Sequence, residues 1–248
     1  MQRVKISKTG KVKKKIIITF TKKRKKDMRA KEIISTLVMP LKPSDPGSLA
    51  LTWMEDLGIM HLPVVENSNL LGMVKSSDIY NLDDLDQPLS LQNIPFIRSF
   101  VYADFHIYEV LRLAAAENLS VIPVLDQHNQ YLGCTTRAEI IQGMADFTSV
   151  TQPGGILVLE INTQQYSLSE ISRLIETNDA KVLSSAVTSA ADSTKLEVTI
   201  KVNVMNLASI IQTLNRFDYI IKASFAEESQ YDALLSERFE SLMKFLDT

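Results

Sequence analysis

An internal repeat constrains this chain more than any other feature of its sequence. The segment LTWMEDLGIMHLPVVENSNLLGMVKSSDI, from Leu51, aligns with LRLAAAENLSVIPVLDQHNQYLGCTTRAEI, from Leu111, at an offset of 60 residues that becomes 61 after one inserted residue. Self-similarity of this kind indicates two copies of one structural unit. The matching pairs are Pro63 with Pro123, Val64 with Val124, Glu66 with Asp126, Leu71 with Leu132, Gly72 with Gly133, Asp78 with Glu139, and Ile79 with Ile140.

Each copy predicts the order helix, strand, turn, strand, helix. In the second copy Ile107, Val110 and Ala114 keep helical spacing, and the strands VIPVL and YLGCTT follow around the polar turn DQHNQ. The first copy has the strands HLPVV and LLGMV around the turn ENSN. A copy of roughly 50 residues buries its apolar face poorly alone, so we expect the two copies to pack together as one module.

This pattern resembles the cystathionine-beta-synthase-type (CBS) domain, which occurs as tandem pairs. The resemblance covers about residues 33–145 and rests on a helix, a PVV(D/E)-type strand, a polar turn and a G-h-h-(S/T)-x-x-D segment, where h is apolar. It implies that the pair binds an adenosyl ligand (AMP, ATP or S-adenosylmethionine) in clefts between the repeats. It also implies that the Ser/Thr and Asp of the last segment hold the ribose hydroxyls, a task that suits a carboxylate because it accepts O–H bonds.

Both copies depart from that pattern in their last segment. GMVKSSD keeps Asp78 but has Lys75 at the hydroxyl position, whereas GCTTRAE keeps Thr136 but has Glu139 in place of the aspartate. We expect Lys75 to meet a phosphate and the other three residues to reach a ribose. The alternative is that both segments only cap the helices that follow, as Ser, Thr and Asp do at helix starts. The apolar wall of the clefts is expected from the two strands, at Leu62, Pro63, Ile122 and Pro123.

A different pattern begins after the break at Pro153–Gly155. The sequence predicts a strand, a helix that starts at a capping box from Ser167 to Glu170, two strands joined by a polar turn, a second helix and a closing strand. This βαββαβ order is that of the ferredoxin-like plait. The predicted strands are 156–161, 181–187, 195–202 and 219–225. The fold class is therefore α/β for the repeats and α+β for the C-terminal part.

By length and order the C-terminal part resembles an ACT domain, a small regulatory fold that often senses amino acids and dimerises. Amino-acid-binding members usually have glycine in the turn between the first strand and first helix, but the turn 162–167 has none, which favours a structural or dimerising role. A CBS pair joined to an ACT-like domain resembles the acetoin-utilisation regulatory family. The apolar positions of a predicted final helix form one stripe: Tyr231, Leu234, Leu235, Phe239, Leu242 and Phe245. Such a stripe packs on its own domain or across a subunit boundary, and the second case predicts a homodimer.

The net charge of −2 hides a basic leader. Residues 1–27 contain twelve of the 27 basic residues and one acid, so the remaining residues hold 15 basic and 28 acidic side chains. The leader predicts either a disordered arm that tethers the chain to nucleic acid or anionic lipid, or a mis-assigned start with translation beginning at Met28. We favour the second interpretation. The acidic remainder does not favour nucleic acid as a partner.

Composition and motifs exclude several other functions. No run approaches the ~20 apolar residues of a membrane span, there is no signal-peptide pattern, and the single cysteine fits a reducing cytoplasm. Phosphate-binding loops, nucleophile elbows and metal-ligand spacings are absent, and the acids Asp83, Asp84 and Asp86 lack the further oxygen ligands of a cation loop. We therefore expect no catalytic residues, no bound metal and no required cofactor.

The sequence thus divides into a leader (1–27), a first CBS repeat (28–90), a second repeat (91–148), a linker (149–155) and an ACT-like domain with its final helix (156–248). The hypothesis is a non-enzymatic cytoplasmic ligand sensor that acts on a partner enzyme or transporter. The alternative is an adaptor whose modules serve oligomerisation or partner binding without a ligand, tethered through the leader.

Overall fold

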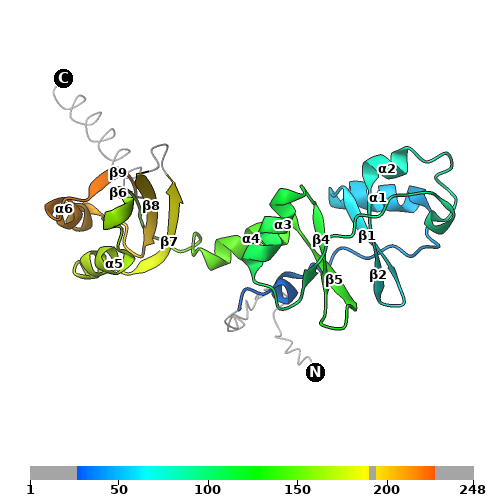
Figure 1. Cartoon of the computed structure of the whole chain (residues 1–248), viewed down its shortest axis with the longest axis horizontal. Helices are drawn as coiled ribbons and strands as arrows, with labels where there is room; N and C mark the ends of the chain where they lie inside the picture. Colours follow the sequence, from blue (N-terminus) through cyan, green and yellow to red (C-terminus); the bar gives the residue numbers. More distant parts are fainter. Residues whose placement is uncertain (1–26, 190–193, 227–248) are drawn as a thin grey trace, which may run out of the picture.

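The computed structural model describes residues 27–189 and 194–226. Each repeat has the predicted order helix, strand, strand, helix (Figure 1). The first repeat consists of α1 (Gly47–Leu57), β1 (His61–Glu66), β2 (Asn69–Lys75) and α2 (Ser76–Tyr80). The second consists of α3 (Ile107–Ala116), β4 (Val121–Leu125), β5 (Tyr131–Thr136) and α4 (Arg137–Phe147). The predicted leader and final helix lie outside the described residues.

The two repeats pair their strands in the same way. Both hairpins are antiparallel, with Val64 opposite Gly72 in the first and Val124 opposite Gly133 in the second. The short strand β3 (Val101–Tyr102) runs parallel to β4, and Leu41 makes the corresponding parallel bridge to β1. The hairpins differ in their turns. Asn67 and Ser68 with positive φ make the tight first turn, whereas the longer second turn has Asp126 accepting from the N–H groups of His128 and Gln130.

Short segments cross between the repeats. The 3-10 helix η1 (Ala30–Ile33), at the start of the described chain, packs on the second repeat. Ala30 N–H donates to the carbonyl oxygen of Phe105 (2.8 Å), and Ser35 N–H donates to the carbonyl oxygen of Cys134 (2.8 Å). The segment with η2 (Leu89–Leu91) packs on the first repeat, where Met73 N–H donates to Ile97 (2.8 Å). The expected division at residues 90 and 91 therefore follows the chain but not the packing.

The hydrophobic cores of the repeats are interleaved. Met73 of the first repeat belongs to the core built around Ile107 and Ile122, whereas Val121 and Cys134 of the second repeat belong to the core built around the first. This exchange explains why neither repeat would bury its apolar face well alone. The two repeats form one packed module, as the sequence predicted.

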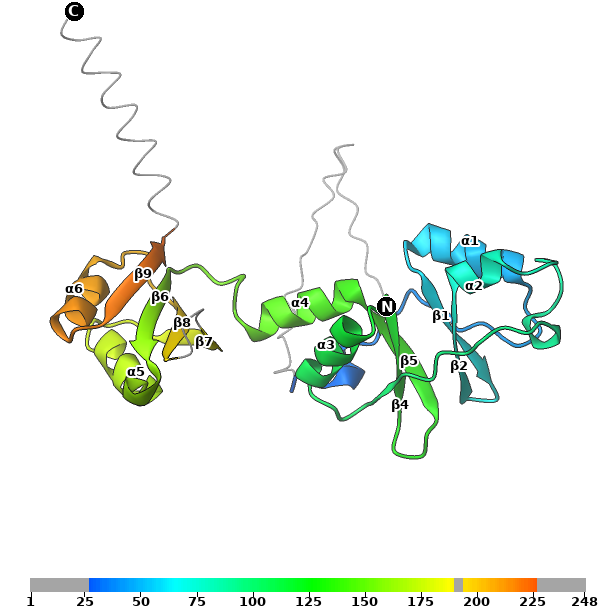
Figure 2. The same cartoon turned by 45° about the horizontal axis from the view of Figure 1, so that its top comes forward.

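The C-terminal part has the predicted βαββαβ order, with strands β6 (Ile156–Asn162), β7 (Val182–Ser189), β8 (Lys195–Val202) and β9 (Ile220–Phe225). Helices α5 (Leu168–Glu176) and α6 (Ala208–Arg216) cover one face of this antiparallel sheet, whose strand order is β7-β8-β6-β9 (Figure 2). A short 3-10 helix, η3 (Thr163–Gln165), follows β6. The core between helices and sheet contains Leu157, Leu159, Ile171, Leu174, Ile175, Val198, Ile200, Ile210 and Leu214.

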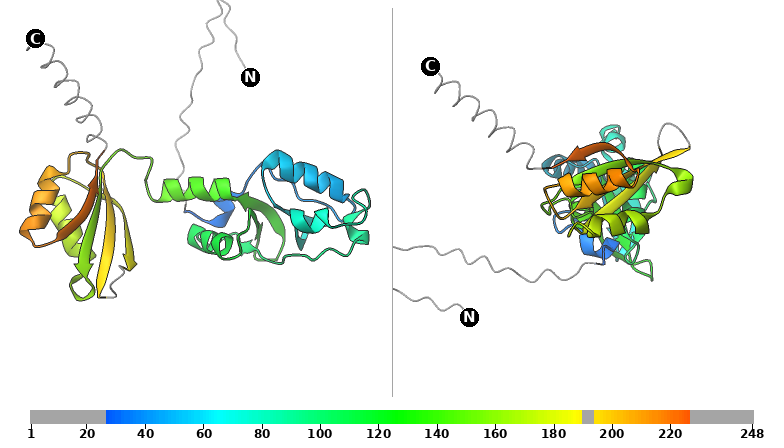
Figure 3. Two further views of the ribbon diagram at one scale, coloured as in Figure 1. Left: turned by 90° about the horizontal axis from the view of Figure 1, so that it is seen from above. Right: turned by 90° about the vertical axis from the view of Figure 1, so that its left-hand side faces the viewer.

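The break at Pro153–Gly155 has a structural reason at its glycines. Gly154 has φ +150°, and a Cβ there would lie 1.9 Å from the carbonyl oxygen of Val202. Gly155 N–H donates to the carbonyl oxygen of Val204, and the carbonyl oxygen of Gly155 accepts from Val202 N–H. The linker from α4 is thereby fastened to the end of β8 before β6 begins (Figure 3).

No helix in residues 27–189 and 194–226 is long and apolar enough to cross a membrane.

Candidate functional site

The first predicted site lies where β2 leads into α2. Lys75 ends the strand with an exposed side chain, and Asp78 is half-buried in the first turn of the helix. The Asp78 carboxylate accepts from Ser77 Oγ at 3.3 Å. Within the described chain no side chain caps α2, so the capping alternative is wrong for this segment. The Asp78 carboxylate is therefore not used to cap α2.

The second predicted site is built differently. Thr136 caps α4, its Oγ1 accepts from Ala138 N–H at 3.2 Å, and Glu139 accepts from Thr136 N–H at 3.0 Å. The Thr136 hydroxyl also donates to Glu139. These bonds make a complete capping box. In this structure Thr136 and Glu139 therefore cap α4, as the alternative interpretation of this segment expected. Burial acts to raise the pKa of Glu139, but hydrogen bonds from the Thr136 and Ser35 hydroxyls outweigh it and lower this pKa.

The expected apolar wall is not open. Leu62 and Ile122 are fully buried, each in one of the two interleaved cores, and Pro63 and Pro123 are buried beside them. The carbonyl of Pro63 accepts from Leu41 N–H at 2.8 Å, which ties this strand to the parallel segment beside it. These four side chains stabilise the fold, and their role as the wall of a ligand cleft stays a prediction. Strand periodicity cannot distinguish a core face from a cleft wall, since both are apolar.

The structure adds a polar junction that the sequence did not reveal. Strands β1 and β4 start side by side, where Met60 N–H donates to Ser120 Oγ (2.9 Å) and Ser120 N–H donates to His61 Nδ1 (3.2 Å). Nδ1 of His61 also lies 2.9 Å from Ser120 Oγ. Because Nδ1 accepts from a backbone N–H, the neutral imidazole carries its proton on Nε2.

This junction lies between the two predicted sites. Burial lowers the pKa of His61, the nearby cations Lys75 and Arg137 lower it further, and Asp78 opposes them. Arg137 is held by the carbonyls of Leu119 (2.9 Å) and Asn118 (2.8 Å). Charged residues at the starts of both α2 and α4 thus affect the pKa of the buried imidazole. No local pattern in the sequence marked His61 or Arg137 as part of a site.

A hollow of about 450 Å³ lies at the hairpin end of the repeats, away from the predicted residues. Its lining includes Arg98, Phe100 and Asn129. None of the eight ligand residues predicted from the sequence lines it.

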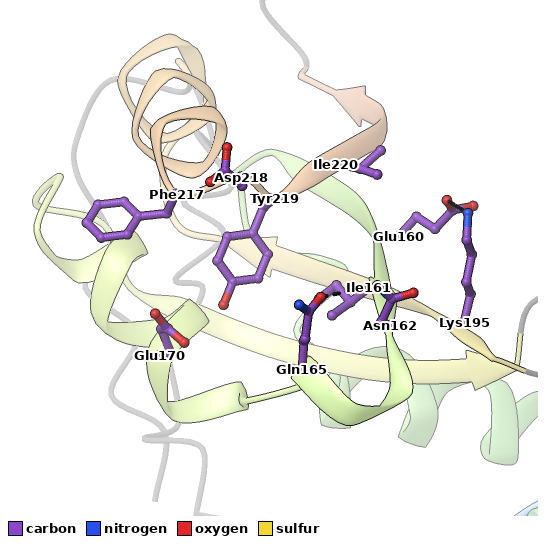
Figure 4. A pocket seen from close by; sticks show the side chains of 10 residues that line it. All are labelled: Glu160, Ile161, Asn162, Gln165, Glu170, Lys195, Phe217, Asp218, Tyr219 and Ile220. Atoms are coloured by element: carbon purple, nitrogen blue, oxygen red, sulfur yellow. Dashed lines mark hydrogen bonds and ion pairs between the residues drawn. The ribbon is translucent and has the colours of Figure 1, made fainter.

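A larger hollow of about 630 Å³ lies in the C-terminal part, at the glycine-free turn after β6 (Figure 4). Lys195 and Glu160 form an ion pair there at 2.6 Å, and the Tyr219 hydroxyl is directed toward Gln165 and Glu170. Burial, followed by the Glu170 carboxylate, raises the pKa of Tyr219. The remaining lining is Ile161, Asn162, Phe217, Asp218 and Ile220. This hollow therefore borders the turn at residues 162–167, which contains no glycine.

Two of the acids that follow α2 accept hydrogen bonds from neighbouring residues of their turn and from α1. Asp84 accepts from Asp86 N–H (2.9 Å) and from the Gln87 side chain (3.0 Å), and Asp86 accepts from Ser48 Oγ (3.0 Å). Across the part of the chain that the structure describes, no group of three or more His, Cys, Asp or Glu residues is placed to hold a metal ion.

No family model matches the chain. An uncharacterized protein of Methanocaldococcus jannaschii is 23% identical over 125 residues, which cover 49% of this chain and 46% of that protein. The inosine-5'-monophosphate dehydrogenase of the same organism is 26% identical over 117 residues, which cover 46% of this chain and 23% of the enzyme. The chain therefore spans less than half the length of these two curated relatives.

Solved structures of CBS-domain pairs also match part of the chain. A CBS domain pair/ACT domain protein of Thermotoga maritima is 18% identical and covers 48% of this chain and 98% of its own, with a TM-score of 0.43. CBSX2, a protein of Arabidopsis thaliana, in its complex with AMP is 18% identical and covers 48% of this chain and 96% of its own, with a TM-score of 0.42. Each match covers less than half of this chain.

Proposed function

We propose that this chain is a non-enzymatic regulatory protein whose repeat pair binds an adenosyl ligand, AMP, ATP or S-adenosylmethionine, at the start of α2. The observation that carries the proposal is the Asp78 carboxylate, half-buried in the first turn of α2 and not used to cap it, three residues after the exposed Lys75. A carboxylate in this position can accept two ribose O–H bonds, and an ammonium beside it can meet a phosphate.

The proposal gives the two repeats unequal roles. Asp78 is available to a ligand, whereas Glu139 already accepts from the Thr136 backbone and hydroxyl in the capping box of α4. A ribose bound by Glu139 would have to replace these bonds, so the net free energy of binding at Glu139 would be less favourable than at Asp78. We expect the first repeat to hold the ligand more tightly than the second.

Calorimetric titration of AMP, ATP and S-adenosylmethionine into the full chain tests this function. Replacing Asp78 by Ala removes a charged hydrogen-bond partner of the ribose and should weaken binding by about ten- to a hundredfold. Glu139→Ala should weaken it less. Asp56→Ala, which removes an exposed carboxylate from α1 of the same repeat, is the matched control and should leave affinity unchanged.

Two results would count against this function. Tight binding that survives both Asp78→Ala and Lys75→Met places the ligand elsewhere. No binding of any of the three compounds favours the alternative, an adaptor that keeps the repeat pair for its shape. The capping box of α4 and the buried positions of Leu62 and Ile122 are the observations that favour this alternative.

The remaining parts of the proposal concern how the chain acts. The C-terminal part is proposed as an ACT-like module, and the whole as a relative of the acetoin-utilisation regulatory family that acts in the cytoplasm on a partner enzyme or transporter. Its βαββαβ order supports the first of these assignments. The homodimer predicted from the stripe at Tyr231–Phe245 falls outside the described residues and stays a prediction, which light scattering of the full chain would measure.

A further inference from the structure

The outer face of α3 and α4 is apolar and exposed. Tyr108, Leu111 and Ala115 lie along one side of α3 at helical spacing, and Ile141 lies on α4 beside them. Tyr108 is 53% exposed and Ile141 69%. A shallow hollow of about 250 Å³ separates the two helices, and its lining is mostly Leu, Ile and Ala. We call Tyr108, Leu111, Ala115, Ile141 and Phe147 the α3–α4 face.

This face extends to the last residue of α4. The rings of Tyr108 and Phe147 meet edge to face at 5.2 Å, and His106 packs against both at 5.0 and 5.3 Å. Phe147 is followed by the linker, where Val150 is exposed. Exposed apolar side chains are thus present up to and just beyond the end of α4, the end from which the chain leads to the C-terminal part (Figure 2). Contiguous exposed apolar surface of this kind marks an interaction site.

The corresponding face of the first repeat is different. The repeat alignment places Ser48 opposite Tyr108 and Glu55 opposite Ala115, so two of its positions are polar. The chain that follows α2 also returns to α1, since Ser48 N–H donates to Leu85 (2.9 Å) and Ser48 Oγ to Asp86 (3.0 Å). After α4 the chain instead leads into the C-terminal sheet. The repeat that is joined to the C-terminal part is therefore the one with the apolar face.

We propose that residues 227–248 of the same chain dock their apolar stripe, Tyr231 to Phe245, on the α3–α4 face. The segment leaves the sheet at the right place, because Phe225 pairs with Ile156, the first residue of β6 after the linker from α4. Its 22 residues would span about 33 Å as a helix, roughly twice the length of the 11-residue α4. Covalent attachment through so short a linker gives an effective concentration on the order of millimolar.

Thiol labelling of the full chain tests the docking. The native Cys134 is buried, and burial raises its pKa to about 11, so it reacts slowly with a maleimide. Ile141→Cys reports on the α3–α4 face, and Tyr80→Cys reports on the matched position of the first repeat, which is 68% exposed. We expect the thiol at 141 to react at least tenfold more slowly than the thiol at 80.

Changes in the segment identify what provides the protection. Leu235→Glu with Leu242→Glu places charges in the stripe and should raise the labelling rate at 141 to that at 80. Ala233→Glu with Ser236→Glu adds the same charges at positions that helical spacing puts opposite the stripe, and should leave the protection intact. Continued slow labelling of the buried Cys134 in both variants shows that the repeat pair is still folded.

Three outcomes would overturn the proposal. Equal rates at 141 and 80 in the unaltered segment mean that the face is free. Protection that survives Leu235→Glu with Leu242→Glu means that something other than the stripe covers it. Protection that disappears on dilution means that the cover comes from a second copy of the chain, as in the predicted homodimer.

Discussion

His61 is a buried titratable side chain whose neutral form is built into the junction of the repeats. Its Nδ1 accepts a hydrogen bond from the Ser120 N–H. Burial lowers the pKa of His61, and the nearby cations Lys75 and Arg137 lower it further. Protonation would remove the acceptor that Ser120 uses and would place a third cation beside the other two. A histidine buried in its neutral form is one source of acid instability.

The repeat module should therefore lose stability in acid. The pKa of His61 is lowered by folding, so the unfolded chain binds the proton more readily, and the stabilisation present above the ordinary pKa of about 6.5 is lost as pH falls through and below it. Urea unfolding between pH 8 and pH 5 measures this. His61→Asn, which keeps an acceptor but cannot titrate, should flatten the slope, whereas His128→Gln in the exposed turn should not. An equal slope in His61→Asn would contradict the assignment.

At the scale of secondary structure, Gly154 is needed for its lack of a side chain. Gly154→Ala would force a Cβ toward the Val202 carbonyl and should destabilise the C-terminal part by about 2 kcal/mol or more. Gly58→Ala is the control, since its φ is also positive (+62°) but no atom lies within 4 Å of the added Cβ, so its cost should be only about 1 kcal/mol. Thermal unfolding compares the two, and equal losses would show that the close approach to Val202 is unimportant.

The elements that the sequence predicted are those with local causes. The helix–strand–strand–helix repeats and the βαββαβ order follow from hydrophobic periodicity and turn residues, which act over a few positions. The crossing of η1 onto the second repeat and the contact of His61 with Ser120 join residues about 60 or more positions apart, and no local pattern encodes them. The site was predicted in part for the same reason. Asp78 and Glu139 were located from the repeat, but whether each carboxylate caps its helix depends on side-chain geometry.

At the scale of the whole molecule, the interleaved cores couple the start of the described chain to the second repeat. Ile33 is buried in the core around Ile107 and Ile122, and the Cγ2 of Ile34 lies 2.6 Å from where a Cβ on Gly133 would be. Met28 and Ala30 belong to the same core. Residues about 75 to 100 positions apart thus stabilise one another, so the repeat module should unfold as one unit.

Two shortened chains test this coupling. A chain beginning at Met28 should keep the melting temperature of the full chain, because it retains every residue that contributes to the core at this end among those that the structure describes. A chain beginning at Leu37 loses Met28, Ala30 and Ile33 and should melt far lower, since removal of each large buried side chain costs about 2 to 5 kcal/mol. Ile33→Ala should fall between them, whereas Leu37→Ala, at an exposed position, should change little. Calorimetry resolves the transitions. A drop of more than a few degrees on removing residues 1–27 would mean that the leader contributes to the fold, and a chain from Leu37 that melts like the full chain would mean that η1 is dispensable to the second repeat.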